Sequence, residues 1–143
     1  MTTLYQVAAA NKGIVVGTGN KVEDFGVGFY TKYGDGGVDL SPIADLLKSE
    51  VYALGKALDV PNSIMTAVPS DGLFGDARTD EDQIGASYDE LEWAMKMKDE
   101  GKNANDFEGR QKEVFAIFNQ FNTSNAHKMN PIPVCIIPEI IKQ

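Results

Sequence analysis

Apolar residues recur at helical spacing in four long stretches of the chain, and this pattern predicts a mainly helical protein. Helices are expected at about 4–10, 42–58, 88–100 and 106–122, with a short helical turn at 61–65. Start signals support these bounds, because Ser-Pro opens the second helix and a Ser-x-x-Glu capping box opens the third. The residues expected to face the core are Leu4, Val7, Ala8, Ile43, Leu47, Val51, Leu54, Leu58, Leu91, Ala94, Met95, Val114, Phe115, Phe118 and Phe121.

One short run has the pattern of a buried strand. Residues 14–16 are Ile-Val-Val, which is typical of a parallel sheet covered on both faces. A Gly-Thr-Gly-Asn turn at 17–20 and a short helix at 21–26 follow, which is how α/β folds present a ligand at the carboxyl end of a strand. A single strand cannot make a sheet, so its partners belong either to another chain or to the rest of a larger fold.

The segment from residue 29 to residue 42 combines glycine, aromatic and charged residues. Three glycines stand within four positions at 34–37, which suits a backbone that turns sharply or lies close to a ligand. One lysine, two aspartates and three aromatic residues accompany them, and these types bind a charged, flat molecule rich in hydroxyls. We therefore expect a nucleotide-binding loop here. An acidic, glycine-containing loop at 69–82 is expected to be able to close over a site.

Length and charge narrow the possible partners. A chain of 143 residues fits one domain with a single core. The formal net charge of −8 argues against a nucleic acid or an anionic membrane as partner, because both would repel the protein. One cysteine, no secretory pattern at the N-terminus and no apolar run of roughly 20 residues indicate a cytoplasmic protein.

Several segments carry a resemblance to a known family. The Thr-Lys-Tyr-Gly-Asp-Gly-Gly run at 31–37 is highly specific. The matching segments are 17–23 (Gly-Thr-Gly-Asn-Lys-Val-Glu), 29–39, 47–48 (Leu-Lys) and 79–81 (Thr-Asp-Glu). Together they resemble the carboxyl-terminal half of ammonia-dependent NAD⁺ synthetase, in the N-type ATP pyrophosphatase family. The similarity covers roughly residues 3–98 and resumes at 124–128.

The resemblance implies a fold and a reaction. The fold would be α/β, part of a three-layer, Rossmann-like arrangement with a parallel sheet, of which this chain supplies a mainly helical portion. The enzyme would be a ligase of NAD biosynthesis that joins deamido-NAD⁺ and ammonia while ATP is cleaved to AMP and pyrophosphate. An adenylate forms first, because a carboxylate needs a good leaving group before ammonia can displace it. The family's enzymes are homodimers whose sites use both subunits.

By position, the resemblance implies roles at the ATP end of the site. Thr18 is expected to contact ATP at the end of the strand, and Lys48 to meet the ATP phosphates. Ser70 stands where an ATP-contacting threonine is common. Glu23 is expected to hold Mg²⁺.

Four further positions match residues of the family that bind deamido-NAD⁺. They are Lys32, Asp39, His127 and Lys128. Residue chemistry agrees with this assignment, because a lysine suits a pyrophosphate or carboxylate and an aspartate accepts hydrogen bonds from ribose hydroxyls.

The sequence also departs from the family. The phosphate-binding signature Ser-Gly-Gly-x-Asp-Ser is absent from these 143 residues, together with a second metal-binding aspartate and a substrate-binding arginine. We therefore interpret residues 1–143 as the carboxyl-terminal part of one synthetase domain, a fragment inactive alone, with an extended tail at 129–143. Two alternatives stay open. One is a non-catalytic module for dinucleotide binding or dimerisation that complements a separate half. The other is a related ATP pyrophosphatase acting on another acid.

Overall fold

Helices dominate the computed structural model, which describes residues 1–70, 75 and 78–142. In chain order they are α1 (Thr2–Ala10), η1 (Lys21–Val27), α2 (Lys48–Ala57), α3 (Asn62–Met65), α4 (Asp80–Ile84), α5 (Tyr88–Asp99), η2 (Ala104–Asp106), α6 (Gly109–Ser124), α7 (Ala126–Met129) and η3 (Glu139–Ile141). The expectation of a mainly helical chain is confirmed. Within the described residues, β structure is limited to one isolated parallel bridge between Val16 and Leu40. The three-layer sheet stays a prediction.

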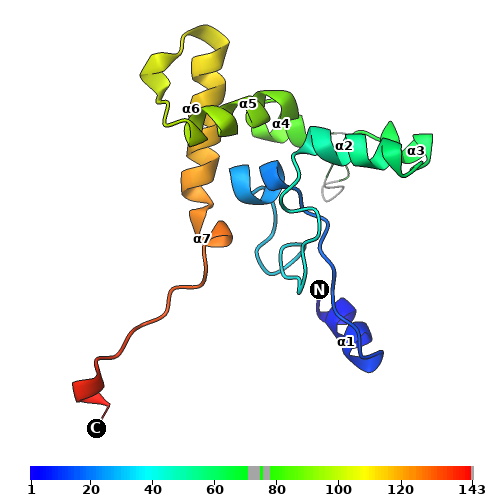
Figure 1. Cartoon of the computed structure of the whole chain (residues 1–143), viewed down its shortest axis with the longest axis vertical. Coiled ribbons are helices and arrows are strands. Elements are labelled where there is room, and N and C mark those ends of the chain that lie inside the picture. The colour runs from blue at the N-terminus through cyan, green and yellow to red at the C-terminus, as the bar shows by residue number, and fades with distance from the viewer. Residues whose placement is uncertain (71–74, 76–77, 143) are drawn as a thin grey trace.

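The helices are spread out and do not form one compact bundle (Figure 1). The longest helix, α6, crosses α5, and η1 packs against both. Helices α2 and α3 extend away from this centre, while α1 lies at the far end of a long irregular segment (Figure 1). The 29–42 segment leaves the packed centre after η1 and leads toward α2.

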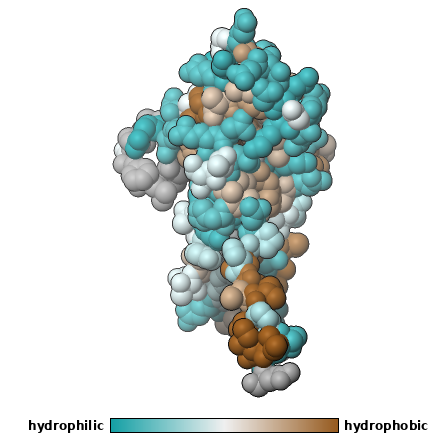
Figure 2. Space-filling view, turned by 90° about the vertical axis from the view of Figure 1, so that its left-hand side faces the viewer, coloured by the Kyte–Doolittle hydropathy of each residue, from teal (hydrophilic) through white to brown (hydrophobic). Residues whose placement is uncertain are grey.

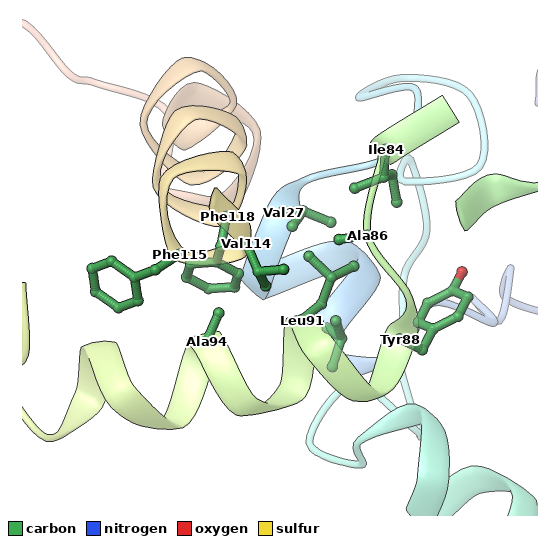
Figure 3. Packing of buried hydrophobic residues seen from close by; sticks show 10 residues of the cluster. Val27, Ile84, Ala86, Tyr88, Leu91, Ala94, Val114, Phe115 and Phe118 are labelled. Atoms are coloured by element: carbon green, nitrogen blue, oxygen red, sulfur yellow. The ribbon is translucent and has the colours of Figure 1, made fainter. Parts of the chain in front are cut away.

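A small apolar core lies where η1, α5 and α6 meet (Figure 3). Leu91 and Ala94 of α5 have no exposed surface, and Phe118 of α6 is 1% exposed. Trp93 and Phe107 pack edge to face beside the core, with 4.9 Å between ring centroids. The core consists of Val22, Val27, Ile84, Ala86, Tyr88, Leu91, Ala94, Val114, Phe115 and Phe118. The apolar stripes predicted for α5 and α6 are confirmed.

The start of α5 follows its sequence signal. The Ser87 hydroxyl accepts a hydrogen bond from the Glu90 N–H, and the Glu90 carboxylate accepts one from the Ser87 N–H, so the predicted capping box is present. Arg110 of α6 then bonds both carboxylate oxygens of Glu90 at 2.8 Å. These bonds to Arg110, with the Ser87 N–H, lower the pKa of Glu90 to about 2. This pair joins the first turns of the two core helices.

The predicted helix at 42–58 begins later than expected. Residues 42–46 form turns and a bend, and α2 starts at Lys48 with Leu47 in an extended conformation before it. Two contacts favour this later start, because the Leu46 carbonyl accepts from the Lys21 N–H at 2.8 Å and the Leu47 N–H donates to Glu50. The Ser-Pro signal was therefore wrong as a helix start.

The predicted burial of the strand and of the first helix was wrong for this chain. Val15 is buried, but Ile14 is 60% and Val16 is 51% exposed. No residue of α1 is buried, although its apolar residues share a face. A lone extended segment with one bridge has no neighbouring strand or helix layer, among the described residues, that could cover it.

The chain after α7 runs without regular structure from residue 130 to residue 138 and ends in η3. Its isoleucines and valine are exposed, and Figure 2 shows this apolar surface at one extremity of the molecule. Among the described helices, none is both long enough and apolar enough to span a membrane. Residues 71–74 and 76–77 of the acidic loop predicted at 69–82 lie outside the described residues, and its last residues begin α4.

Candidate functional site

The turn before η1 is fixed by the buried side chain of Asn20. Its Oδ1 accepts from the N–H groups of Val22 and Glu23 at 3.0 and 3.1 Å, so Asn20 caps the first turn of η1. Its amide nitrogen donates to Glu23 Oε2. Asn20 therefore fixes both the start of the helix and the direction of the Glu23 side chain.

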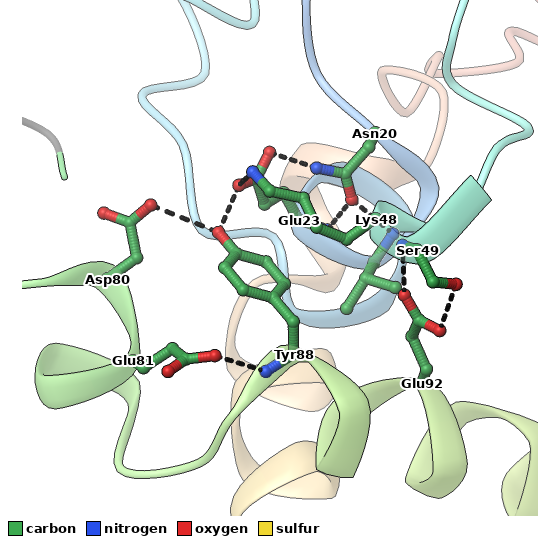
Figure 4. Close-up of polar contacts among 9 residues, drawn as sticks. Asn20, Glu23, Lys48, Ser49, Asp80, Glu81, Tyr88 and Glu92 are labelled. Carbon is green, nitrogen blue, oxygen red and sulfur yellow. Dashed lines mark hydrogen bonds and ion pairs between the residues drawn. The ribbon is translucent and has the colours of Figure 1, made fainter. Parts of the chain in front are cut away.

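Glu23 lies at the centre of a polar network (Figure 4). Its Oε1 forms a 2.9 Å ion pair with Lys48 Nζ, and both side chains are 18% exposed. The Tyr88 hydroxyl donates to the same oxygen and lies 3.1 Å from an oxygen of the buried Asp80. The Lys48 ammonium also lies 4.5 Å from the centroid of the Tyr88 ring. The expected metal ligand and the expected phosphate-binding lysine are thus in direct contact.

Burial and charge both act on the acidic groups of this network. Burial, followed by the hydrogen bond to Glu23 and its negative charge, raises the pKa of Tyr88, so the phenol stays protonated. Burial and the neighbouring charges of Glu23 and Asp35 raise the pKa of Asp24 to about 6. The carboxylates of Glu23 and Asp35 thus repel that of Asp24, while Glu23 itself is paired with the Lys48 ammonium.

Gly19 is required for the close approach of the turn to η1. A Cβ at position 19 would lie 1.9 Å from a carboxylate oxygen of Asp24, so a larger residue would displace that carboxylate. Gly19, the second glycine of the Gly-Thr-Gly-Asn turn, therefore lets the Asp24 side chain lie directly against the backbone.

A cavity of about 180 Å³ brings three of the expected residues together. Thr18, Glu23 and Ser70 line it, with Asp24 and Asp80 beside them. Lys48 lies in a neighbouring hollow of about 230 Å³, next to Ser87 and Tyr88, and its ammonium reaches Glu23. The four residues expected at the ATP end therefore form one neighbourhood.

A larger cavity of about 650 Å³ lies on the other side of the 29–35 loop. Phe29, Tyr30 and Asp35 line both this cavity and the smaller one, so the loop separates the two. Phe121 and Lys128 from the carboxyl-terminal helices complete its far wall. The mixture of aromatic rings, a carboxylate and an ammonium suits a planar, polar ligand.

The residues expected to bind the dinucleotide lie in two places. Lys32 Nζ donates to the His127 carbonyl, and Lys128 lines the large cavity, so these three are neighbours. Asp39 lies elsewhere: its carboxylate accepts from the Val15 N–H at 2.9 Å and from the Tyr5 hydroxyl at 3.3 Å. His127 and Asp39 are exposed.

Sequence reasoning missed several members of the site. The sequence indicates only helix N-terminal charge at Asp80 and a capping segment at Tyr88, yet both are buried beside Glu23. Only the tertiary arrangement brings them there, since they lie 57 and 65 residues from Glu23. Asn20 was identifiable from the preference of asparagine for helix caps.

The chemistry that the small cavity can support follows from its oxygen ligands and its lysine. Carboxylate oxygens are the ligands that Mg²⁺ uses in proteins, and Glu23 offers them beside a lysine suited to phosphate. There is no cluster of three or more His, Cys, Asp or Glu ligands among the described residues. A metal here would therefore need further ligands, such as phosphate oxygens, besides Glu23.

Comparisons with known proteins give a consistent result. A family model described as NAD synthase matches residues 1–132. An NH(3)-dependent NAD(+) synthetase of Thermoplasma acidophilum is 50% identical over 92 residues, which cover 64% of this chain and 37% of that protein. One of Archaeoglobus fulgidus is 38% identical over 141 residues, which cover 99% of this chain and 54% of that protein.

A solved structure shows the same relationship at the level of the backbone. The NMN synthetase of Francisella tularensis superposes with a TM-score of 0.74 at 34% identity, over 96% of this chain and 52% of that one. The chain thus spans between about a third and about half of the length of the relatives it matches. Since the family model matches 132 of the 143 residues, the chain belongs to the NAD synthase family.

Proposed function

We propose that this chain provides the carboxyl-terminal part of an ammonia-dependent NAD⁺ synthetase that works in the cytoplasm. The reaction converts deamido-NAD⁺ and ammonia to NAD⁺, with ATP cleaved to AMP and pyrophosphate. One observation carries the proposal in addition to the relatives' names. Thr18, Glu23 and Ser70 line one cavity, and Lys48 is bonded to Glu23, although these residues are scattered over more than 50 positions of the sequence.

At the ATP end, each side chain has a role that fits its chemistry. Thr18 and Ser70 offer hydroxyls to the nucleotide, and Lys48 offers an ammonium to the phosphates. Glu23 would hold Mg²⁺, which would neutralise phosphate charge. Asn20 and Tyr88 orient the Glu23 carboxylate through their hydrogen bonds.

At the dinucleotide end, Lys32, His127 and Lys128 would bind deamido-NAD⁺ around the large cavity. The nicotinate carboxylate would attack the α-phosphorus of ATP, which forms the adenylate and releases pyrophosphate. Ammonia would then displace AMP from the acyl carbon. Asp39 would serve the dinucleotide as an acceptor for ribose hydroxyls from its position beside Val15.

The exposed edge around residues 14–16 supports the proposal that another half completes the site. Val15 O and Gly17 N are bonded to the 39–40 segment, so the opposite edge of the short strand faces outward with Ile14 and Val16 exposed. Further parallel strands would cover this edge. We therefore propose that the chain is inactive alone, and that the complete enzyme is a homodimer.

A direct assay tests this proposal. The chain is mixed with ATP, Mg²⁺, deamido-NAD⁺ and ammonium, and NAD⁺ and AMP are measured by chromatography. We expect no turnover from the chain alone. We expect equal amounts of NAD⁺ and AMP once the amino-terminal half of the Archaeoglobus fulgidus relative is added as a separate polypeptide. Glu23→Gln should reduce that restored activity at least about 100-fold, while the same change at exposed Glu108 should not.

Sustained turnover by the chain alone would contradict the proposed incompleteness. A second candidate, the non-catalytic binding module, is favoured by the engagement of both Glu23 oxygens with protein donors. Binding of deamido-NAD⁺ in calorimetry, without turnover in any mixture, would select it. The Francisella relative is an NMN synthetase, so the same titration with nicotinate mononucleotide tests whether a mononucleotide acid binds in place of the dinucleotide.

A further inference from the structure

The carbonyl groups at the end of η1 are bonded by side chains from the opposite end of the chain. Asn122 Nδ2 donates to the Gly26 carbonyl at 2.7 Å, and Asn125 Nδ2 donates to the Val27 carbonyl at 2.8 Å. Lys128 Nζ donates to the Gly28 carbonyl at 2.9 Å. These three donors, Asn122, Asn125 and Lys128, are here called the carbonyl clamp.

The spacing of the carbonyl clamp matches the helix that carries it. Its members stand three residues apart, which places them along one side of the α6–α7 segment. They meet three successive carbonyls at 26–28, groups that a helix end leaves without partners inside the helix. Donors spaced three residues apart on α6–α7 are therefore paired with carbonyls of consecutive residues at the end of η1.

The carbonyl clamp extends from the helix end into the loop. Lys128 Nζ also donates to the Tyr30 carbonyl at 2.7 Å, and the Tyr30 hydroxyl donates back to the Lys128 carbonyl. Beyond Tyr30, Lys32 Nζ donates to the His127 carbonyl. The loop is thus held from residue 26 to residue 32 by contacts with one short stretch of the carboxyl-terminal helices.

Gly28 shows how closely the two segments approach. Its φ of +62° lies in the left-handed region, and a Cβ at this position would lie 2.5 Å from the Cβ of Asn125. Any side chain here would therefore both strain the backbone and push Asn125 away. Glycine is what allows the Val27 carbonyl to reach the amide of Asn125.

The carbonyl clamp also shapes the large cavity. Asn125 and Lys128 line one wall, and Phe29, Tyr30 and Asp35 of the loop line the other. The bonds described above therefore fix the two walls relative to each other. Two of the three N–H groups of Lys128 serve the carbonyls of Gly28 and Tyr30, so the third can face a ligand.

We infer that Asn122 and Asn125 are positioning residues that hold the 29–37 loop in the conformation that accepts the deamido dinucleotide. They act through the backbone of Gly26 and Val27 and need no contact with the ligand. This inference rests on the proposed function, because it assigns the large cavity and its loop to the dinucleotide. It adds a requirement that the carboxyl-terminal helices be docked before the loop is competent.

The substitution Asn125→Asp tests the inference with almost no change in shape. A carboxylate in place of the amide removes the donor and turns an acceptor toward the Val27 carbonyl. The matched control is Asn130→Asp, which makes the same charge change at an exposed residue five positions away. Gly28→Ala disturbs the same contact from the other side.

Hydrogen exchange is the first readout. The N–H groups of Gly34 and Gly36 are bonded to the Thr31 carbonyl at 2.9 and 3.1 Å, so their exchange reports on the loop. We expect Asn125→Asp to speed exchange of these amides about tenfold, with no change in the core amides of α5 and none in Asn130→Asp. Unchanged loop exchange, or faster exchange throughout the core, would overturn the inference.

Calorimetry with deamido-NAD⁺ and with ATP is the second readout. We expect Asn125→Asp and Gly28→Ala to weaken deamido-NAD⁺ binding about three- to tenfold. ATP binding should weaken less, because Thr18, Lys48 and Ser70 lie outside the loop. Equal weakening of both ligands would overturn a positioning role specific to the loop. If the unaltered chain binds no deamido-NAD⁺ even after the amino-terminal half of the Archaeoglobus fulgidus relative is added, the proposed function fails, and the exchange experiment alone still decides whether the carbonyl clamp holds the loop.

Discussion

Leu91 in α5 and Leu4 in α1 are the same residue type on helices that the apolar pattern predicts alike, yet they have opposite environments. Leu91 has no exposed surface, whereas Leu4 is 55% exposed. The same contrast separates the packed region, formed by η1 and α4–α6, from the open region, formed by α1 and residues 11–16. A periodic stripe thus indicates which face of a helix is apolar, while the rest of the fold decides whether that face is covered.

The most severe loss of stability is expected in the packed region. Leu91→Ala removes a fully buried side chain where η1, α5 and α6 meet, and should lower the free energy of unfolding by about 3 kcal/mol. Denaturant unfolding followed by circular dichroism measures this change. The control Leu4→Ala should cost less than about 0.5 kcal/mol, and equal costs at the two positions would remove the contrast between the regions.

Acid should weaken the packed region through Glu90. Its folded pKa of about 2 lies below the usual value, so its contribution to stability is complete above pH 4.5 and disappears as the pH falls toward 2. Because the Glu90 side chain is 31% exposed, solvent screening limits this contribution to about 1 kcal/mol. Glu90→Gln should cost that amount at pH 7, and the cost should shrink as the pH falls through about 2 in unfolding titrations. A cost that does not vary with pH would show that the Arg110 pair contributes nothing.

The stability contribution of Asp24 should change with pH in the opposite direction from that of Glu90, because the pKa of Asp24 is raised. Its side chain lines the small cavity at the border of the packed region. Its folded pKa of about 6 is raised, so the folded state loses stability as the pH rises from about 4 to 6. Asp24→Asn should therefore raise the free energy of unfolding by about 1 kcal/mol at pH 7 after solvent screening, and leave it unchanged near pH 3. Asp45→Asn, at an exposed aspartate, is the control. If Asp24→Asn were stabilising at both pH 7 and pH 3, the effect would not come from the raised pKa of Asp24.

The weakest effect in the chain alone is expected at the open region. Ile14→Thr should change the free energy of unfolding by less than about 0.5 kcal/mol, because Ile14 is 60% exposed. The same substitution should weaken association with the complementary amino-terminal half about tenfold, since burial of that side chain would then be lost. Titration of the two halves, with exposed Ile64→Thr as control, would measure the difference. If the Ile14→Thr and Ile64→Thr variants bound the amino-terminal half with equal affinity, Ile14 would not lie at the interface between the halves.

The order of the amino acids was sufficient to predict the local structure of α5 and the apolar faces of α5 and α6, because a capping box and a helical stripe act within a few residues. The resemblance also assigned Thr18, Glu23, Lys48 and Ser70 to one end of the site, and these residues do lie near one another. The start of α2 was missed, because the contact of Leu46 with the distant Lys21 and the local cap by Glu50 outweigh the Ser-Pro signal.

Only the tertiary packing decides which residues distant in the sequence come into contact. Tyr88 reaches Glu23 across 65 residues, and Lys128 reaches the Gly28 carbonyl across 100. No periodicity encodes such pairs, because they depend on how η1 docks between α5 and α6. The burial of each helix face is decided in the same way, since an apolar stripe is covered only where another part of the fold supplies a matching surface.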